Sequence, residues 1–284
     1  MLKENLLTAN KMAINFASGQ GDRPQILFLH GVTRRWQDFS LVIPHFETDW
    51  QVMALDFRGH GRSGRADHYR TIDYVDDVVS VLQQLVPGKT VLYGHSLGAM
   101  VAAAVAARAP QPVRALVLED PPWHTLGTHI TETVFHSHFM GMYRVAKQGG
   151  TVDELARALS QIEIKAPHAT SGKRLGEVRD AVSLRFAASC LRQVDPAVLE
   201  SIISGRWLEG YDWEAILSAI QCPTLMLQAD WSAGGMLADQ DAERAEKLIS
   251  SCWRIRMAGV GHLIHWQAHE RLLAHVTAFL SSLE

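Results

Sequence analysis

Cysteine is scarce in this sequence of 284 residues, which contains only three. Cys190, Cys222 and Cys252 lie far apart, and no C-x-x-C pair occurs. An odd number of widely separated cysteines argues against a disulfide framework, and reduced thiols are typical of cytosolic proteins. We therefore expect three free thiols and a cytoplasmic location.

Long apolar runs and an excess of positive charge are also absent. No stretch reaches the roughly 18 apolar residues of a membrane-spanning helix, and residues 1–20 lack the apolar region of a secretory signal. The net charge is −3, whereas proteins that bind nucleic acids or anionic membranes carry a basic face. We expect a small-molecule substrate and neither nucleic acid nor membrane as a partner; the oligomeric state is left open.

What the sequence does contain is an alternation of short apolar runs and helical patterns. Runs rich in Val, Leu and Ile and bounded by Gly or Pro are typical of buried strands in a parallel sheet. They occur at residues 25–29, 51–57, 90–93, 113–118, 223–228 and 253–257. Helical patterns occur at residues 73–85, 97–109, 241–249 and 267–283. This alternation predicts an α/β fold with a mostly parallel central sheet flanked by helices.

The alternation stops between residues 123 and 212. This segment has no convincing strand pattern, and its helical stretches fall at residues 152–162, 176–191 and 196–204. We therefore predict a core formed by residues 1–122 and 213–284. Residues 123–212 are expected to form an inserted helical cap over the C-terminal edge of the sheet.

Residues 94–98 read G-H-S-L-G, which matches the pattern G-x-S-x-G. The motif follows a short apolar strand and opens an apolar helix, as a nucleophile elbow requires. Glycines flank such a turn because side chains would clash there, and the helix N-terminus adds partial positive charge beside the serine. We predict that Ser96 is a nucleophile.

His262 is the expected base of this nucleophile. It ends the sequence G-V-G-H at residues 259–262, which follows the last strand. A catalytic base must lie on such a loop above the C-terminal edge of the sheet, and it follows the serine in the chain order that this motif requires. His265, one turn later, is expected to pack against or cap the next helix.

Two backbone N–H groups are predicted to form an oxyanion hole. Leu97 directly follows the nucleophile, and Val32 lies in the loop after the strand at 25–29, beside the elbow. Donors of this kind stabilise the charge that develops on a carbonyl oxygen during acyl transfer. His30, at the end of the same strand, is expected to be packed and structural.

Over nearly its whole length the chain resembles the α/β-hydrolase superfamily. The resemblance rests on H-G at residues 30–31, D-x-R-G-H-G-x-S at 56–63, G-H-S-L-G at 94–98 and G-x-G-H at 259–262. Residues 56–63 form a scaffold turn in that family, and we assign them no chemistry. The inserted cap is similar to that of esterases, lactonases, dehalogenases, epoxide hydrolases and carbon–carbon bond hydrolases. Dehalogenases and epoxide hydrolases carry Asp at the elbow, so Ser96 argues against both chemistries.

The resemblance leaves the acid of a Ser-His-Asp triad open. The usual position, after the strand at 223–228, holds Ser232, while Asp230 directly ends that strand. Some branches of the family place the acid after the strand that follows the nucleophile helix, and Asp120 occupies that position. A carboxylate buried at a strand end requires a partner, which His262 would provide. We predict Asp120 as the acid, with Asp230 as the alternative. Further candidates are Glu119 and Asp239.

Together these residues predict a serine hydrolase that cleaves an ester or lactone bond in a small to medium apolar substrate through an acyl-enzyme. No residues cluster at the spacing of metal ligands, so neither a metal nor another cofactor is expected. One alternative is a carbon–carbon bond hydrolase, although Ala99 stands where that group often has Gly. The other is a non-hydrolytic ligand receptor or a cofactor-free oxygenase on the same fold.

Large side chains are candidates for the substrate pocket, with packing of cap against core as the alternative. The predicted pocket residues are Trp36, Trp123, Met140 and Tyr143. Further candidates in the cap are His124, Met142 and Trp207. Arg34 and Arg35 follow the oxyanion loop. We expect them to be a solvated surface pair, and pairing with a substrate carboxylate is the alternative.

Overall fold

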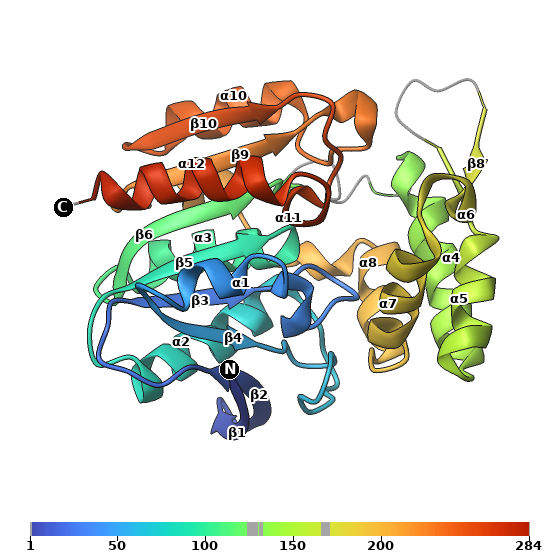
Figure 1. The fold of residues 1–284 in the computed structure, drawn as a ribbon, viewed down its shortest axis with the longest axis horizontal. Helices are drawn as coiled ribbons and strands as arrows, with labels where there is room; N and C mark the ends of the chain where they lie inside the picture. The colour runs from blue at the N-terminus through green and yellow to red at the C-terminus, as the bar shows by residue number, and fades with distance from the viewer. Residues whose placement is uncertain (1, 124–129, 131–132, 166–170, 284) are drawn as a thin grey trace.

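The computed structural model describes residues 2–123, 130, 133–165 and 171–283. Its centre is an eight-stranded sheet with the order β1-β2-β4-β3-β5-β6-β9-β10. The strands are β1 (Lys3–Ala9), β2 (Met12–Ser18), β3 (Gln25–Leu29), β4 (Gln51–Leu55), β5 (Thr90–His95), β6 (Val113–Glu119), β9 (Thr224–Ala229) and β10 (Cys252–Met257). From β4 to β10 all neighbours are parallel, and only β1 and β2 run antiparallel to their neighbours. The predicted α/β class with a mostly parallel sheet is confirmed (Figure 1).

Helices cover both faces of the sheet, so its central strands are buried on both sides. In β3, Leu27 and Leu29 face one apolar cluster, and Ile26 and Phe28 face the other, as the two-residue period of a strand requires. The first cluster packs against α2 (Thr71–Leu85), α3 (Leu97–Arg108) and α10 (Asp239–Leu248). The second packs against α1 (Ile43–Phe46), α11 (Ile264–Gln267) and α12 (His269–Ser281).

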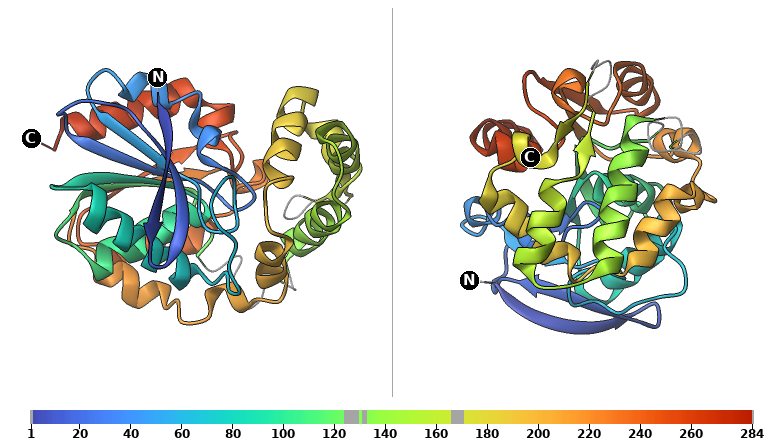
Figure 2. Two further views of the ribbon diagram at one scale, coloured as in Figure 1. Left: turned by 90° about the horizontal axis from the view of Figure 1, so that it is seen from below. Right: turned by 90° about the vertical axis from the view of Figure 1, so that its right-hand side faces the viewer.

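The segment between β6 and β9 forms a separate helical layer beyond the C-terminal ends of the strands (Figure 2). Its helices are α4 (Val134–Gln148), α5 (Val152–Ser160), α6 (Leu175–Val178), α7 (Ala181–Leu191) and α8 (Pro196–Ile203). They pack on one another, α4 against α8 and α5 against α7. The chain then returns to the core through α9 (Trp213–Ser218), which packs against α3. The exact boundaries of a cap domain at 123 and 212 stay a prediction.

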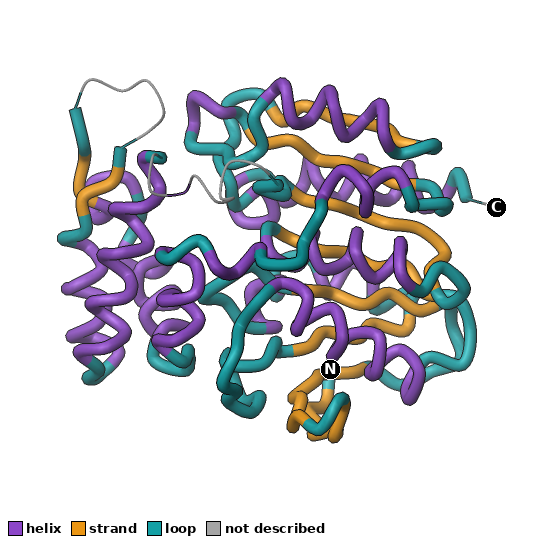
Figure 3. Tube along the Cα trace, turned by 180° about the vertical axis from the view of Figure 1, so that it is seen from behind, coloured by secondary structure: helices purple, strands orange, loops and turns teal. Residues whose placement is uncertain are grey.

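One expectation for this segment was wrong, because it also contains a small antiparallel sheet. The strands β7 (Glu163–Ile164) and β8 (Lys173–Arg174) pair with each other. Two residues per strand are too few to give a periodic pattern, so the sequence did not reveal them. The view from behind shows this pair at the outer end of the helical layer (Figure 3). Within the described part of the chain, every helix is too short or too polar to cross a membrane.

Candidate active site

Ser96 lies at the sharp turn that joins β5 to α3. Its backbone has φ 54° and ψ −117°, which is rare for a residue other than glycine. The glycines around it are required by space: a Cβ at Gly94 would overlap the carbonyl group of Gly98, and one at Gly98 would overlap that of Leu29. Non-glycine residues in such conformations persist only where the surrounding structure holds them, and they are frequent at active sites.

The N–H groups of Leu97 and Val32 are both available beside Ser96. Leu97 is the first residue of α3, so its N–H has no partner within the helix. Neither N–H donates a hydrogen bond among the residues that the structure describes. The loop that carries Val32 is fixed by its neighbour, since the N–H of Thr33 donates to Nε2 of His60 at 3.3 Å. Burial lowers the pKa of His60 to about 3, so the ring is neutral and can accept this bond.

His60 belongs to the scaffold turn at residues 56–63, so this turn supports the loop that carries Val32. Its first residue, Asp56, accepts hydrogen bonds from the N–H of Trp36 at 2.8 Å and of Arg62 at 3.0 Å. His30 is also structural, because its Nε2 accepts the N–H of Phe57 at 3.0 Å. Burial lowers the pKa of His30 to about 4, which keeps this ring neutral too.

His262 lies in the loop between β10 and α11, and its Nδ1 is 2.7 Å from Oδ2 of Asp120. Asp120 directly follows β6 and is completely buried, with a positive φ of 45°. Its carboxylate also accepts three backbone N–H groups, from Ala229 at 3.0 Å, Met236 at 2.7 Å and Leu237 at 3.3 Å. A buried carboxylate needs such partners to remain charged.

The other candidate acids lie elsewhere. The carboxylate of Asp230 accepts the N–H and the hydroxyl of Ser232 and the N–H of Gly259. Asp239 contacts Arg256 and Gln228. The loop after β9, where the family's usual acid would lie, instead supplies two of the backbone donors to Asp120. The structure thus brings Asp120, and not Asp230, to the imidazole of His262.

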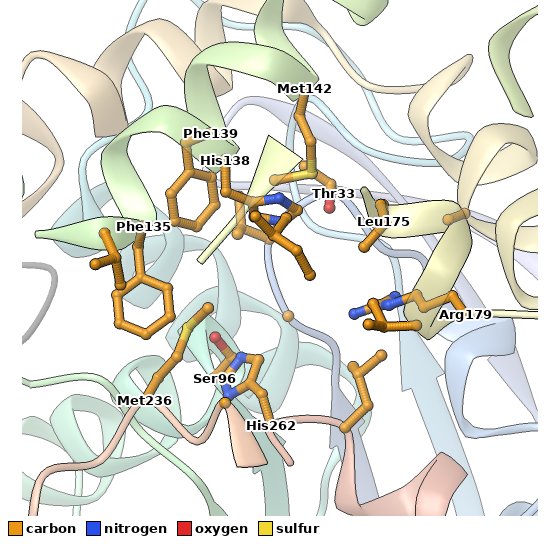
Figure 4. Close-up of a pocket in the computed structure, with 18 of the residues that line it drawn as sticks. Thr33, Ser96, Phe135, His138, Phe139, Met142, Leu175, Arg179, Met236 and His262 are labelled. Carbon is orange, nitrogen blue, oxygen red and sulfur yellow. The ribbon is translucent and has the colours of Figure 1, made fainter. Parts of the chain in front are cut away.

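Ser96 and His262 line the same cavity, and Figure 4 shows both at its floor. Within the described residues no hydrogen bond joins Oγ of Ser96 to the imidazole, and such bonds are often long until substrate is bound. His95 contacts the loop of His262, since its Nε2 lies 3.0 Å from the carbonyl oxygen of His262. The two rings are in contact, with centroids 4.6 Å apart.

Behind the site lies a buried group of charges that the sequence did not reveal. Nδ1 of His265 is 2.7 Å from Glu119, and its Nε2 is 3.2 Å from Asp38. Burial disfavours the charged ring, but Glu119 and Asp38 outweigh it and raise the pKa of His265 to about 9. Burial would likewise raise the pKa of Asp38, yet Arg34 and His265 hold it well below its ordinary value. His265 is buried and packs against Phe39, as expected of a packed residue, and it also joins two carboxylates, which was not expected.

One potential metal-ligand cluster occurs among the described residues: Asp38, His95 and His265 each place a ligand atom within 4.8 Å of the others. All three residues are buried. Both ring nitrogens of His265 already bind carboxylates, and Nε2 of His95 binds the carbonyl group of His262. A metal ion held by His265 would have to displace one of its contacts with Glu119 and Asp38, so these contacts describe a hydrogen-bonded network.

A cavity of about 480 Å³ covers Ser96 and His262, within the size range of small-molecule sites. Several elements contribute to its apolar wall, among them α4, where Phe135, Phe139 and Met142 recur at the spacing of one helix face. Figure 4 shows them above the two polar residues. Met142 was among the further candidates of the sequence analysis, and Phe135 and Phe139 were missed.

The four predicted pocket residues do not contribute to the cavity wall as far as the chain is described. Trp123 is buried and stacks on Trp213, with ring centroids 6.2 Å apart. Trp36 donates its indole N–H to Glu4 at 2.8 Å. Met140 and Tyr143 lie on other faces of α4 than its cavity-lining residues, because neighbouring positions of a helix point in different directions. Trp207 is buried outside the cavity wall, and His124 lies outside the described residues.

The expectation of a solvated arginine pair was also wrong for Arg34. Its side chain is buried, lies 3.7 Å from Asp38 and lines the cavity. Arg35 instead donates to Gln193 of the α7–α8 loop at 2.7 Å and to Ser189 of α7 at 3.3 Å. The two neighbouring arginines therefore point to different partners.

Known proteins resemble this chain in sequence and in fold. The 2-(acetamidomethylene)succinate hydrolase of Mesorhizobium japonicum is 35% identical over 102 residues, which are 36% of this chain and 37% of that protein. Epoxide hydrolase 4 of Mus musculus is 28% identical over 138 residues, 46% of this chain and 38% of that protein. These matches thus span less than half of each relative's length. The crystal structure of the enol-lactonase from Burkholderia xenovorans LB400 has a TM-score of 0.76 at 16% identity and covers 98% of this chain and 100% of that one.

The family of this protein follows from a family model, because the model matches far more of the chain than any single motif. The model for the alpha/beta hydrolase fold matches residues 24–268, from the start of β3 to the end of α11. This range includes the turn at Ser96, the strand end at Asp120 and the loop of His262. The protein belongs to the α/β-hydrolase fold family.

Proposed function

We propose that this protein is a serine hydrolase that cleaves an ester or lactone bond in a small to medium substrate with a largely apolar body. The observation that supports this proposal most directly is the contact of 2.7 Å between Nδ1 of His262 and Oδ2 of the buried Asp120. This contact orients the imidazole in the cavity that Ser96 also lines (Figure 4). Ser96, His262 and Asp120 then serve as nucleophile, base and orienting acid.

In the proposed reaction, Nε2 of His262 takes the proton of the Ser96 hydroxyl while Oγ bonds to the substrate carbonyl carbon. The negative charge moves to the carbonyl oxygen, and the N–H groups of Val32 and Leu97 donate hydrogen bonds to it. His262 returns its proton to the leaving alcohol oxygen as the ester bond breaks. A water molecule then cleaves the acyl-enzyme by the same steps. Asp120 keeps the proton of the neutral ring on Nδ1 and stabilises the cationic ring.

Residue chemistry favours this proposal over the reaction named for one relative. The epoxide hydrolases that the chain resembles carry Asp at the elbow, and this chain has Ser96. The lactonase with the similar fold is consistent with ester-type chemistry, although at 16% identity it shows the fold alone. The proposal therefore rests on the three side chains and on the two free N–H groups.

The test is hydrolysis of short-chain and medium-chain aryl esters by the wild type and by Ser96→Ala. We expect Ser96→Ala to lose turnover and to lose covalent labelling by a fluorophosphonate, with an unchanged circular dichroism spectrum. Ser232→Ala is a matched control, since Ser232 lines the cavity but bonds to Asp230. Ester hydrolysis that survives in Ser96→Ala would refute the proposal. An inert wild type that binds a ligand tightly would favour the receptor alternative.

A further inference from the structure

The cavity above Ser96 is positively charged, although the chain as a whole carries a net charge of −3. The cationic side chains in its wall are those of Arg34, Arg179, Lys165 and Lys173. Within the described residues, no Asp or Glu lines the same wall. A cleft lined by charge of one sign raises the local concentration of ligands of the opposite sign. The substrate cavity thus has the electrostatics of an anion site.

Arg179 lines this cavity, and within the part of the chain that the structure describes no carboxylate forms an ion pair with it. It lies between α6 and α7, and Figure 4 shows the nitrogen end of its side chain directed into the space beside Leu175. Its neighbour Asp180 is committed elsewhere, since its carboxylate accepts the N–H and the hydroxyl of Ser183 at the start of α7. Among the described residues no ion pair or hydrogen bond engages the guanidinium of Arg179. Burial and the charge of Arg34 lower the pKa of Arg179 to about 10, so it remains a cation at neutral pH.

Arg34 lines the cavity too, but its charge is already balanced. Its guanidinium lies 3.7 Å from Asp38, which also contacts His265. Glu119 contacts the other side of His265. In this buried group two carboxylates face two cations, so Arg34 has little need of another anion.

An arginine held in a cavity without a partner is unfavourable until an anion binds, because burial removes the water around the charge. A carboxylate matches a guanidinium especially well, since its two oxygens accept two parallel N–H bonds. One carboxylate also balances one cation. The exposed Lys165 and Lys173 lie in the same wall and draw anions toward it.

We propose that Arg179 binds a carboxylate of the substrate, so that the enzyme acts on an ester or lactone whose acyl part carries this group. The kind of bond that is cleaved rests on the proposed function above. In Figure 4, Arg179 lies on one side of the cavity, and Phe135 and Met236 lie on the other, with Ser96 nearer to the apolar side. A carbonyl placed at Ser96 then directs the acyl carboxylate toward Arg179 and an apolar alcohol part toward the phenylalanine.

The test compares butyl hemiesters of succinic, glutaric and adipic acids with the corresponding butyl esters that end in an uncharged carboxamide. Hydrolysis is followed in a pH-stat for the wild type, Arg179→Gln and Arg179→Lys. Arg185→Gln is the matched control, because it removes one positive charge from the exposed side of α7 and its partner is Asp153. The chain-length series measures the distance between the carbonyl and carboxylate sites.

We expect the wild type to prefer one hemiester over its carboxamide, and Arg179→Gln to lower kcat/KM for that hemiester about 100-fold while the carboxamide ester changes less than about threefold. Arg179→Lys should restore only part of the loss, since it lacks the bidentate geometry. Equal losses on both esters, or no preference for a carboxylate at any chain length, would overturn the proposal.

A binding measurement separates this proposal from the proposed function. The same hemiesters are titrated calorimetrically into Ser96→Ala and into the double variant that also carries Arg179→Gln. If the wild type cleaves no ester but Ser96→Ala binds a hemiester through Arg179, the carboxylate site stands and the hydrolase function fails. If esters are cleaved with Ser96 but neither rate nor binding depends on Arg179, the hydrolase function stands and the carboxylate site fails.

Discussion

Replacing Asp120 with Asn tests which acid orients His262, and the hydrogen bonds around this carboxylate predict the result. Oδ1 accepts the N–H groups of Ala229 and Leu237, at 3.0 and 3.3 Å. Oδ2 accepts the N–H of Met236 at 2.7 Å and faces Nδ1 of His262 at 2.7 Å. An asparagine keeps one accepting oxygen and places an NH₂ donor group where the other oxygen was.

The amide can adopt two orientations, and both are unfavourable. If its NH₂ group replaces Oδ1, it meets two backbone donors, from Ala229 and Leu237. If it replaces Oδ2, it meets one backbone donor, from Met236, and it can donate to Nδ1 of His262. The second orientation leaves fewer donors opposed, so we expect it to dominate. It forces the ring proton onto Nε2, the atom that must accept the proton of Ser96.

The expected loss in kcat is therefore about 10⁴-fold, the size typical of a triad that holds the wrong tautomer. The opposed N–H group should also lower the free energy of unfolding by about 1–3 kcal/mol. The opposed N–H belongs to the backbone of Met236, whose side chain lines the cavity, so we expect KM for an aryl ester to change far less than kcat.

The assay is steady-state hydrolysis of the best aryl ester, with urea unfolding monitored in parallel. Asp230→Asn is the matched control, because Asp230 has the same side chain at a neighbouring strand end but bonds to Ser232 and Gly259. We expect this control to keep kcat within about threefold, as surface changes away from the site usually do. A rate for Asp120→Asn within tenfold of the wild type, or a larger loss in Asp230→Asn, would refute the reasoning.

Two further predictions concern the buried charges and the cavity wall. Burial disfavours the cationic ring of His265, but Glu119 and Asp38 outweigh it and raise the pKa from 6.5 to about 9. The charged ring therefore stabilises the folded protein by an amount on the order of 3 kcal/mol. This contribution is complete below pH 6.5 and is lost as the pH rises through 9. Urea unfolding of the wild type and His265→Gln should show a wide stability gap at pH 6 that narrows by pH 9.5, and a constant gap would contradict this. Met142→Ala should change the preferred acyl chain length and Tyr143→Ala should not, since of these two residues only Met142 lines the cavity. Steady-state kinetics on a series of esters measures this preference, and a change in Tyr143→Ala but not in Met142→Ala would contradict the prediction.

Much of the fold could be predicted from local patterns. The central parallel strands are buried on both faces and read as short apolar runs, so each was visible in the sequence. The edge hairpin of β1 and β2 was missed because most residues of β1 are exposed and no apolar run marks it. Its turn, Asn10 and Lys11, has two residues with positive φ, as a tight hairpin requires.

The sequence by itself determined the residues whose role depends on immediate neighbours. Ser96 could be found because its turn needs glycines at 94 and 98, where a side chain would overlap the backbone. His262 could be found because it follows the last strand of an alternating pattern. The C-terminal ends of parallel strands meet at one edge of a sheet, so the positions of Ser96 and His262 after such strands predicted that both lie at that edge.

Only the tertiary structure decided features that depend on distant segments. Asp120 and Asp230 both end strands of the same sheet, and the choice between them lies in the loop at 236–237, whose N–H groups surround Asp120. The cavity wall depends on which face of α4 turns toward Ser96, and helical periodicity does not specify that direction. Arg179 is a candidate binding residue only in the folded protein, where no carboxylate among the described residues pairs with it. Such pairings join residues far apart in the chain, and no local pattern records them.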